Sequence, residues 1–381
     1  MDCCFFRSTK PFVVVSSSSA PSFPVLPTYV SRRKPRFSSL VNFSGCRRFS
    51  GVTDWRRKII VACESASDWE FTSLNTPYTP KSSKGKILST VLQNDIRDFH
   101  SVVNVQLKGL VDNRQQSVDR LNLSVGSDEE CLHRRIAELQ GNESQISVQD
   151  IIYMLIVYKF KEMEVHMVPK LSSCVCNGRL EIYPSKDWEL ESIHSLEVLE
   201  MVKEHLTVVI GWKENSTLTE NWATKQVHTH HLCRIYAASI LYGYFLKSAS
   251  IRRNLELCLS VANQNMGLAA IGHGSRNLTS LGQYSPFSRG KQCETLKGYL
   301  MRFDTKTLQM HAKPKTKEAA KMIEKHSLAL FGVNEHEDEE IDVISTSMSS
   351  LKRLVLEAIA FGSFLWDAEE YVNAIYKLEE N

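Results

Sequence analysis

Two segments of this chain match each other without a gap, and this internal match constrains the fold more than any other feature. Residues 195–211 and 316–332 each begin with Ser or Thr, end with Gly and lie 121 positions apart. The chemically distinctive residues found in both are Glu197 and Glu318, Met201 and Met322, and His205 and His326. A second match, between residues 240–246 and 359–365, follows at an offset of 119. Two matches in the same order at nearly one offset indicate a duplicated structural unit.

Each copy is predicted to be a pair of helices. The first helix would start at a Ser or Thr cap and end at Gly211 or Gly332, since glycine suits the left-handed conformation that follows a helix. The second would be buried, and its interior glycine, Gly243 or Gly362, costs about 1 kcal/mol relative to alanine. We therefore expect a pseudo-two-fold relation between the copies, with Gly243 and Gly362 placed where helices cross closely.

The hydrophobic periodicity of the chain is almost entirely helical, because apolar residues recur at spacings of three and four. The segments with this period, or with apolar residues on nearly every side, are residues 87–96, 99–110, 132–139, 195–210, 232–246, 316–331 and 351–376. Ser147 and Asp150 resemble a capping box at the start of a further buried helix over residues 151–160. Strand patterns are confined to residues 299–303 and 341–344. The predicted class is mostly α: a helical protein with an internally duplicated helix pair and at most a small strand pair.

The N-terminal 62 residues differ in composition from the rest. Residues 1–60 contain eleven Lys and Arg, eleven Ser and two acids, a balance typical of organelle transit peptides. Their serine-rich, weakly helical character favours the chloroplast over the mitochondrion, with the mature chain starting near Cys63 in the stroma. Without these residues the formal net charge changes from +3 to −6. An acidic mature chain argues against nucleic acid as a partner.

The predicted organisation has five parts. They are a chloroplast transit peptide (1–62), a disordered lead-in (63–83), an N-terminal helical extension with the first repeat (84–259), a mobile loop (260–293) and the second repeat (294–381). The lead-in is polar and contains prolines, and the loop is rich in Gly, Asn and Ser. No apolar stretch reaches the roughly 20 residues that a membrane helix needs. We therefore expect a soluble product without a transmembrane segment.

Several ordered blocks of residues carry a resemblance to a known family. The blocks are residues 134–139, 236–239 with 242–247, 323–326 with 329–332, and 351–358 continuing to 361–367. With them, residues 85–380 resemble the plant UV-B-induced chloroplast protein family, which is built on a plant domain of unknown function. The resemblance implies a nuclear-encoded chloroplast protein tied to light stress, and it assigns no catalytic residues. This chain has Leu196 where relatives tend to have Pro, and the histidine run described next is outside the family pattern.

The run of residues 226–233, QVHTHHLC, concentrates His228, His230, His231 and Cys233. These side chains are zinc ligands in other proteins, but a structural zinc site pairs two ligand clusters from separated segments. The partner cluster would have to be Cys174 with Cys176, or His194. We favour the alternative that the run is a polar entrance to the next helix, with Cys233 buried as a small apolar residue.

The repeated Glu-x3-Met-x3-His pattern, at residues 197, 201, 205 and at 318, 322, 326, is the better functional candidate because both copies have it. Residues four apart share a helix face, but the Glu and the His lie about 12 Å apart along the axis. They cannot bind one metal ion together. We interpret the pattern as structural: Glu interacts with the helix dipole, Met fills the core and His joins core to surface. The alternative is that His205 and His326 meet across the pseudo-two-fold axis and titrate near neutral pH.

Templates for phosphate loops, nucleophile elbows and helical zinc pairs are absent from the sequence. We therefore predict a non-enzymatic binding or regulatory protein, linked to UV-B and light stress, without a cofactor. Its partner would be another chloroplast protein, and peripheral contact with the thylakoid surface is compatible with this composition. The alternative is a His/Cys-based metal-binding protein or an enzyme of the stroma. Eight positions are the candidates for functional or structural repeat sites: Glu197, Met201, His205, Glu318, Met322, His326, Gly243 and Gly362.

Overall fold

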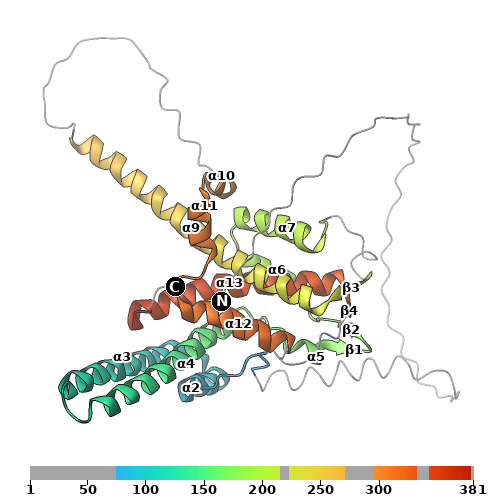
Figure 1. Ribbon diagram of the computed structural model, residues 1–381. Helices are drawn as coiled ribbons and strands as arrows, with labels where there is room; N and C mark the ends of the chain where they lie inside the picture. The colour runs from blue at the N-terminus through green and yellow to red at the C-terminus, as the bar shows by residue number, and fades with distance from the viewer. Residues whose placement is uncertain (1–73, 215–222, 271–294, 333–342, 379–381) are drawn as a thin grey trace, which may run out of the picture. The chain divides into compact units, whose positions relative to one another are not determined.

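The computed structural model describes residues 74–214, 223–270, 295–332 and 343–378, without side chains for 261–270 (Figure 1). All of the described residues belong to one compact unit, and residues 1–56 lie outside the described residues. The predicted transit peptide, the first part of the lead-in and residues 271–293 of the predicted loop also fall outside them.

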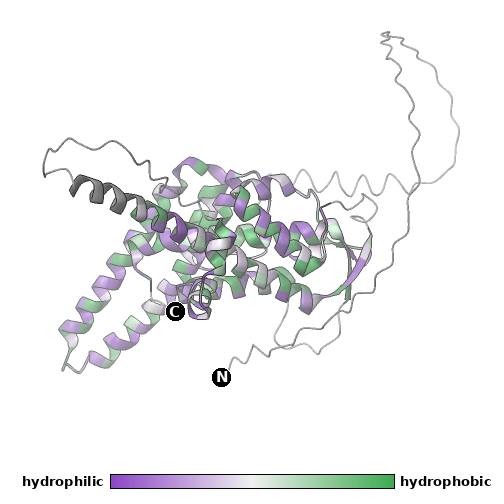
Figure 2. Ribbon diagram, turned by 90° about the horizontal axis from the view of Figure 1, so that it is seen from above, coloured by the Kyte–Doolittle hydropathy of each residue, from purple (hydrophilic) through white to green (hydrophobic). Residues whose placement is uncertain are grey.

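The fold is mostly α, as predicted. The longer helices are α2 (Ser83–Asn94), α3 (Phe99–Ser124), α4 (Glu130–Glu162), α7 (Leu196–Ile210), α9 (Thr229–Ala270), α12 (Lys317–Phe331) and α13 (Met348–Tyr376). The shorter ones are η1 (Ile96–Asp98), α5 (Leu171–Cys174), α6 (Asp187–Ser192), α10 (Leu296–Met301) and α11 (Thr305–Ala312). Figure 2 shows that hydrophobic and hydrophilic residues alternate along most of these helices, as expected for helices with one buried face.

A small sheet joins the two halves of the unit. Its strands are β1 (Val175–Cys176), β2 (Arg179–Leu180), β3 (Thr224–His228) and β4 (Val343–Ser347), in the order β1-β2-β4-β3. β4 pairs in parallel with β2 and antiparallel with β3. The sequence predicted at most a strand pair, so the sheet is larger than expected although each strand is short.

The two matching segments have the same order of elements. α7 is followed by Gly211, β3 and α9, and α12 is followed by Gly332, β4 and α13. Both glycines have left-handed backbone conformations, with φ of 71° and 67°. In the β3–β4 ladder Gln226 lies opposite Ser345, and these two residues are 119 positions apart. The ladder is therefore centred on the same offset that relates the second sequence match.

α9 and α13 form the largest interface between helices, and they lie side by side in Figure 1. A Cβ atom added to Gly243 would overlap the carbonyl oxygen of Ile359, and one added to Gly362 would overlap that of Ile240. Ile240 and Ile359 are themselves 119 positions apart, so the two contacts are reciprocal. Each glycine allows the backbone of the other helix to approach.

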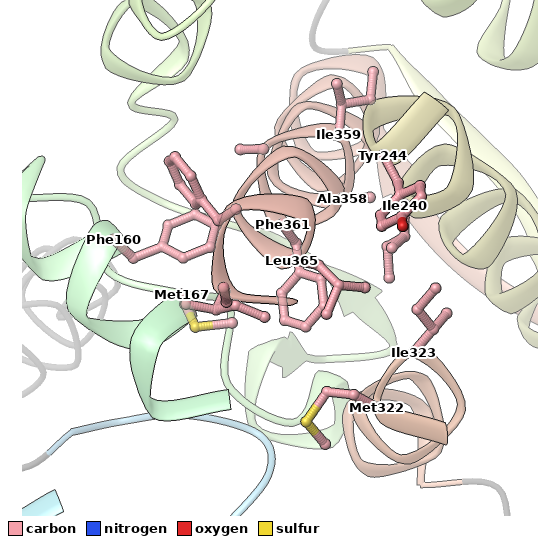
Figure 3. Close-up of a cluster of buried hydrophobic side chains, with 14 of the residues drawn as sticks. Phe160, Met167, Ile240, Tyr244, Met322, Ile323, Ala358, Ile359, Phe361 and Leu365 are labelled. Atoms are coloured by element: carbon pink, nitrogen blue, oxygen red, sulfur yellow. The ribbon is translucent and has the colours of Figure 1, made fainter. Parts of the chain in front are cut away.

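The hydrophobic core surrounds α13. Figure 3 shows Phe361 and Leu365 of this helix among Phe160 of α4, Ile240 of α9 and Met322 of α12. All five side chains are buried. α13 supplies buried residues on nearly every side because α4, α7 and α9 each pack against it.

Two predictions near the N-terminal extension are corrected by the structure. Ser147 and Asp150 do not start a helix, because α4 runs without interruption from Glu130 to Glu162. The Asp150 carboxylate instead accepts hydrogen bonds from the Tyr78 hydroxyl (2.7 Å) and from the backbone N–H groups of Lys81 (2.9 Å) and Ser82 (2.7 Å). Residues 74–82, predicted as part of a disordered lead-in, are thereby held against α4.

Two further predictions differ at element boundaries. Residues 299–303, predicted as a strand, belong largely to α10, because Thr295 caps the Gly298 N–H group and residues 296, 299 and 300 are buried with helical spacing. The loop predicted from residue 260 starts later, since the backbone of α9 continues to Ala270.

Candidate functional site

The first Glu-Met-His stripe lies on α7 at the surface. The Glu197 carboxylate forms a two-point ion pair with the guanidinium of Arg253 on α9, and the hydrogen bond from Arg253 lowers the pKa of Glu197. Met201 is half-buried beside it. A surface cavity of about 260 Å³ opens over Glu197 and Met201 of this stripe. Its lining residues are Glu197, Glu200, Met201, Glu204, Thr295 and Lys297.

The second stripe lies on α12 and is buried. Glu318 is 7% exposed, and Met322 and His326 are fully buried. The reason is the N-terminal extension: α4 packs on α12, and Gln145 of α4 donates a hydrogen bond of 3.1 Å to Glu318. The matching stripes therefore occupy different environments, one lining a surface cavity and the other covered by α4.

The two histidines of the stripes pack in the same manner but do not contact each other. His205 stacks on Tyr242, with ring centroids 4.3 Å apart, and His326 stacks on Phe361 at 4.2 Å. Their Nε2 atoms bond to different partners, the hydroxyl of Ser239 (3.0 Å) and the hydroxyl of Tyr236 (2.9 Å).

Burial governs the protonation of both imidazoles. It lowers the pKa of His205 to about 4 and that of His326 to about 3. Both rings are consequently neutral at physiological pH. The alternative that these histidines meet across the pseudo-two-fold axis and titrate near neutrality is therefore wrong, because each ring has its own partners in an apolar environment.

Tyr153 and Tyr236 flank His326 in the interior, each with its ring centroid 5.8 Å from the imidazole. Both tyrosines are fully buried, and burial raises their pKa values. The Nδ1 atom of His326 has no hydrogen-bond partner among the described residues. The aromatic cluster is neutral, and it joins α4, α9, α12 and α13.

A buried ion pair on α13 lies next to this cluster. Arg353 and Glu357, one helical turn apart, are 2% and 0% exposed, with Nη1 and Oε2 separated by 2.7 Å. Glu357 also accepts the backbone N–H of Val168 at 3.0 Å, and Arg353 donates to the carbonyl of His166 at 2.8 Å. Burial raises the pKa of Glu357. The pair fixes residues 166–168 to α13.

A third buried carboxylate, Glu369, holds the start of α12. It accepts hydrogen bonds from the Thr316 backbone N–H (2.8 Å) and hydroxyl (2.6 Å), and from the Tyr244 hydroxyl (2.5 Å). Burial raises the pKa of Glu369. Neither Glu369 nor the pair Arg353–Glu357 was predicted from the sequence. The charges of Arg353 and Glu357, four residues apart in the otherwise apolar stretch of residues 353–361, were the available signal for that pair.

The histidine run spans a strand and a helix. His228 ends β3, Thr229 begins α9, and His228, His230 and His231 are exposed. Cys233 is half-buried, and burial raises its pKa. Over the described ranges, no three His, Cys, Asp or Glu side chains are grouped so that they could hold a metal ion.

The cysteines named as a possible partner cluster for a zinc site are Cys174, at the end of α5, and Cys176, in β1. Both are free cysteines; burial raises the pKa of Cys174 to about 11, while Cys176 is exposed. A thiol with a raised pKa holds little thiolate at neutral pH, so Cys174 is a poor nucleophile.

In the part of the chain that the structure describes, no helix is both long and apolar enough to cross a membrane.

Comparisons with known proteins identify relatives. The family model described as "Protein of unknown function (DUF760)" matches residues 131–259 and 295–373, which include both matching segments and omit α2, α3 and the C-terminal part of α9. A UV-B-induced chloroplastic protein of Arabidopsis thaliana is 34% identical to this chain, and the match covers 84% of this chain and 83% of the relative. No solved structure matches the chain. These matches confirm the resemblance inferred from the residue blocks, and the chain belongs to the DUF760 family of plant UV-B-induced chloroplast proteins.

Proposed function

We propose that this chain is a non-enzymatic helical protein of the chloroplast stroma that binds a protein partner under UV-B or light stress. The relative from Arabidopsis thaliana is UV-B-induced and chloroplastic by its name. The leader-like composition of residues 1–62 supports import into the same organelle. Peripheral contact of this protein with thylakoid membranes is part of the same proposal.

The observation that carries the non-enzymatic part concerns three buried carboxylates. Asp150, Glu357 and Glu369 are at most 1% exposed. Each accepts hydrogen bonds from backbone N–H groups of a separate segment: residues 81–82, residue 168 and residue 316 respectively. A carboxylate that acts in catalysis must be able to reach a substrate. These three are engaged in holding the fold, which supports a binding role.

The duplicated helical unit supports a scaffold of this kind. The reciprocal contacts of Gly243 and Gly362 and the ladder centred on Gln226 and Ser345 agree with two copies of one unit packed about a pseudo-two-fold axis. Exposed side chains on α3, α7 and β3, among them Val105, Leu196 and Gln226, offer surfaces for contacts with a partner.

The test is capture of partners from chloroplasts. The full-length chain with a C-terminal tag is expressed in leaves, and chloroplasts isolated after UV-B exposure or darkness are used for affinity purification and mass spectrometry. We expect the tagged chain in the stroma and at least one protein enriched after exposure relative to an imported, tagged control protein. A tagged chain outside the chloroplast, or the same background proteins in all samples, would count against the proposal.

The alternative of a metal-binding protein is decided on the same material. Metal content of the purified chain is measured beside a variant in which His228, His230 and His231 are replaced by Gln. Stoichiometric zinc that is lost in the variant would overturn the non-metal interpretation, and equal trace amounts in both proteins would support it.

A further inference from the structure

β3 is an edge strand of the sheet. Among the residues that the structure describes, the order β1-β2-β4-β3 places β4 between two neighbours and gives β3 one. An edge strand presents a row of backbone N–H and C=O groups on its outer side that can pair with another strand. Thr224, Gln226 and His228 are exposed, and Lys225 and Val227 are half-buried.

On β4, the edge that faces away from β3 is already paired with β2. In the β3–β4 ladder, Thr224 pairs with Ser347. Their counterparts at the offset of 119, Val343 and His228, pair with each other as well. The outer edge of β4 therefore corresponds to the outer edge of β3. On β4, the strand β2 pairs in parallel, with Arg179 opposite Ser345 and Leu180 opposite Thr346. The corresponding residues on β3 are Gln226 and Val227.

One side chain of β4 and one on the first turn of α13 help to hold the segment that contains β2. Thr346 donates to the carbonyl of Leu180 at 3.1 Å, and the Ser350 hydroxyl accepts the N–H of Ile182 at 3.1 Å. The residue that corresponds to Ser350 is His231, exposed on the first turn of α9. An imidazole, like a hydroxyl, can accept a backbone N–H group. The histidine run thus places a polar group where the other half uses one to bind a strand.

The basic residues in and next to β3 favour a partner segment with acidic side chains. Residues 224–234 contain Lys225, Arg234 and three histidines, and no acid. A second copy of β3 would bring the same basic residues and no acid, so it would offer this edge no opposite charge. An extended segment with acidic side chains would meet opposite charges instead.

We propose that the outer edge of β3 is a docking site for an extended acidic segment of a partner protein. The segment pairs in parallel with β3, opposite Gln226 and Val227, and its acidic side chains lie beside Lys225 and His231. Backbone hydrogen bonds supply the affinity, and the basic side chains supply the selectivity. This inference rests on the proposed binding function and names the site and the chemistry of the partner.

The test uses the full-length chain and fluorescein-labelled peptides in anisotropy titrations. The probe is an eight-residue peptide of alternating Glu and Val. Two matched peptides accompany it: one of alternating Lys and Val, and one with the acidic sequence but with alternate backbone nitrogens methylated, which removes strand pairing and keeps the charge. We expect the acidic peptide to bind, and each matched peptide to bind at least about tenfold more weakly.

Protein variants test the location of the site. The double variant K225E/H231E should weaken binding of the acidic peptide at least about tenfold. The variant K306E/K313Q, on and next to α11, changes the formal charge by the same amount at exposed positions distant in sequence from β3 and should bind normally. Circular dichroism and thermal melting establish that both variants fold.

Several outcomes would overturn the inference. They are equal binding of the methylated peptide, unchanged binding by K225E/H231E, and a dimer in sedimentation that K225E/H231E dissociates, which would assign the edge to a second copy. If the peptides fail to bind while a partner is still captured from chloroplasts, the partner binds elsewhere and the proposed function stands.

Discussion

Gly243 of α9 and Gly362 of α13 occupy reciprocal positions at one helix crossing. Each glycine faces a carbonyl group of the other helix, about one turn before the glycine of that helix. The neighbouring backbone atoms are carbonyl groups of Ile359 and Ile240, which cannot rotate away as a side chain could. The crossing therefore requires residues without a Cβ atom, and it determines how closely the two halves of the core can pack.

Gly243→Ala and Gly362→Ala should each destabilise the protein by about 3 kcal/mol or more, because the added methyl group separates two helices throughout their interface. This loss opposes the gain of about 1 kcal/mol that alanine brings to a helix. The measurement is the free energy of unfolding in urea. Gly141→Ala in α4 is the matched control, since a Cβ atom there meets nothing within 4 Å, and it should stabilise slightly. Equal stability of all three variants would contradict the requirement for glycine at positions 243 and 362.

Local signals in the sequence predicted much of this architecture. α7 and α12 were placed within a residue of their bounds, because a Ser or Thr cap and a left-handed glycine mark both ends. The class, mostly α, followed from periodicity. The resemblance to the family was confirmed because it depended on long blocks in α4, α9, α12 and α13.

The missed features depend on contacts between distant segments. β3, with the sequence TKQVH, has only one apolar residue and is a strand because β4 pairs with it. Asp150 binds residues 68–72 positions away, so its neighbour Ser147 misleadingly suggested a cap. The two stripes looked alike in sequence, but α4 covers only the second. The coverage depends on tertiary packing, which no local pattern contains.

Tyr78→Phe should lower the free energy of unfolding by about 1 kcal/mol, because it removes the hydrogen bond of 2.7 Å from the hydroxyl to Asp150. Asp150→Ala should cost several times more, since the N–H groups of Lys81 and Ser82 lose their acceptor as well. Limited proteolysis would then cut near residues 74–82 faster than in the unchanged protein. Tyr183→Phe, at an exposed tyrosine, is the control. Protection of residues 74–82 in Asp150→Ala would contradict the anchoring role.

Removing one member of the pair Arg353–Glu357 should cost about 3–5 kcal/mol, because the remaining charge is buried without its partner. Arg353→Met and Glu357→Gln are suitable single variants, and the double variant should cost clearly less than their sum. Urea unfolding of the four proteins gives the coupling between the two side chains. Additive losses would show that the two side chains act independently.

The buried histidines predict loss of stability in mild acid. The pKa of His326 is lowered from 6.5 to about 3, so between these values the unfolded chain binds a proton at this residue and the folded chain does not. Stability is then fully present above pH 6.5 and is lost as the pH falls, by at most about 1.4 kcal/mol per pH unit for one histidine. His205, with a pKa lowered to about 4, contributes over a narrower range.

His326→Gln should therefore be less stable than the unchanged protein at pH 7.5, since it loses the ring that stacks on Phe361. Between pH 6.5 and 4, the slope of its free energy of unfolding against pH should also be smaller, by at most about 1.4 kcal/mol per pH unit. The measurement is the free energy of urea unfolding at half-unit intervals across this range. His230→Gln, at an exposed side chain on the first turn of α9, is the control for replacing a histidine at the surface. A slope in His326→Gln that equals the original one would mean that His326 is protonated in the folded protein, against its placement in the aromatic cluster.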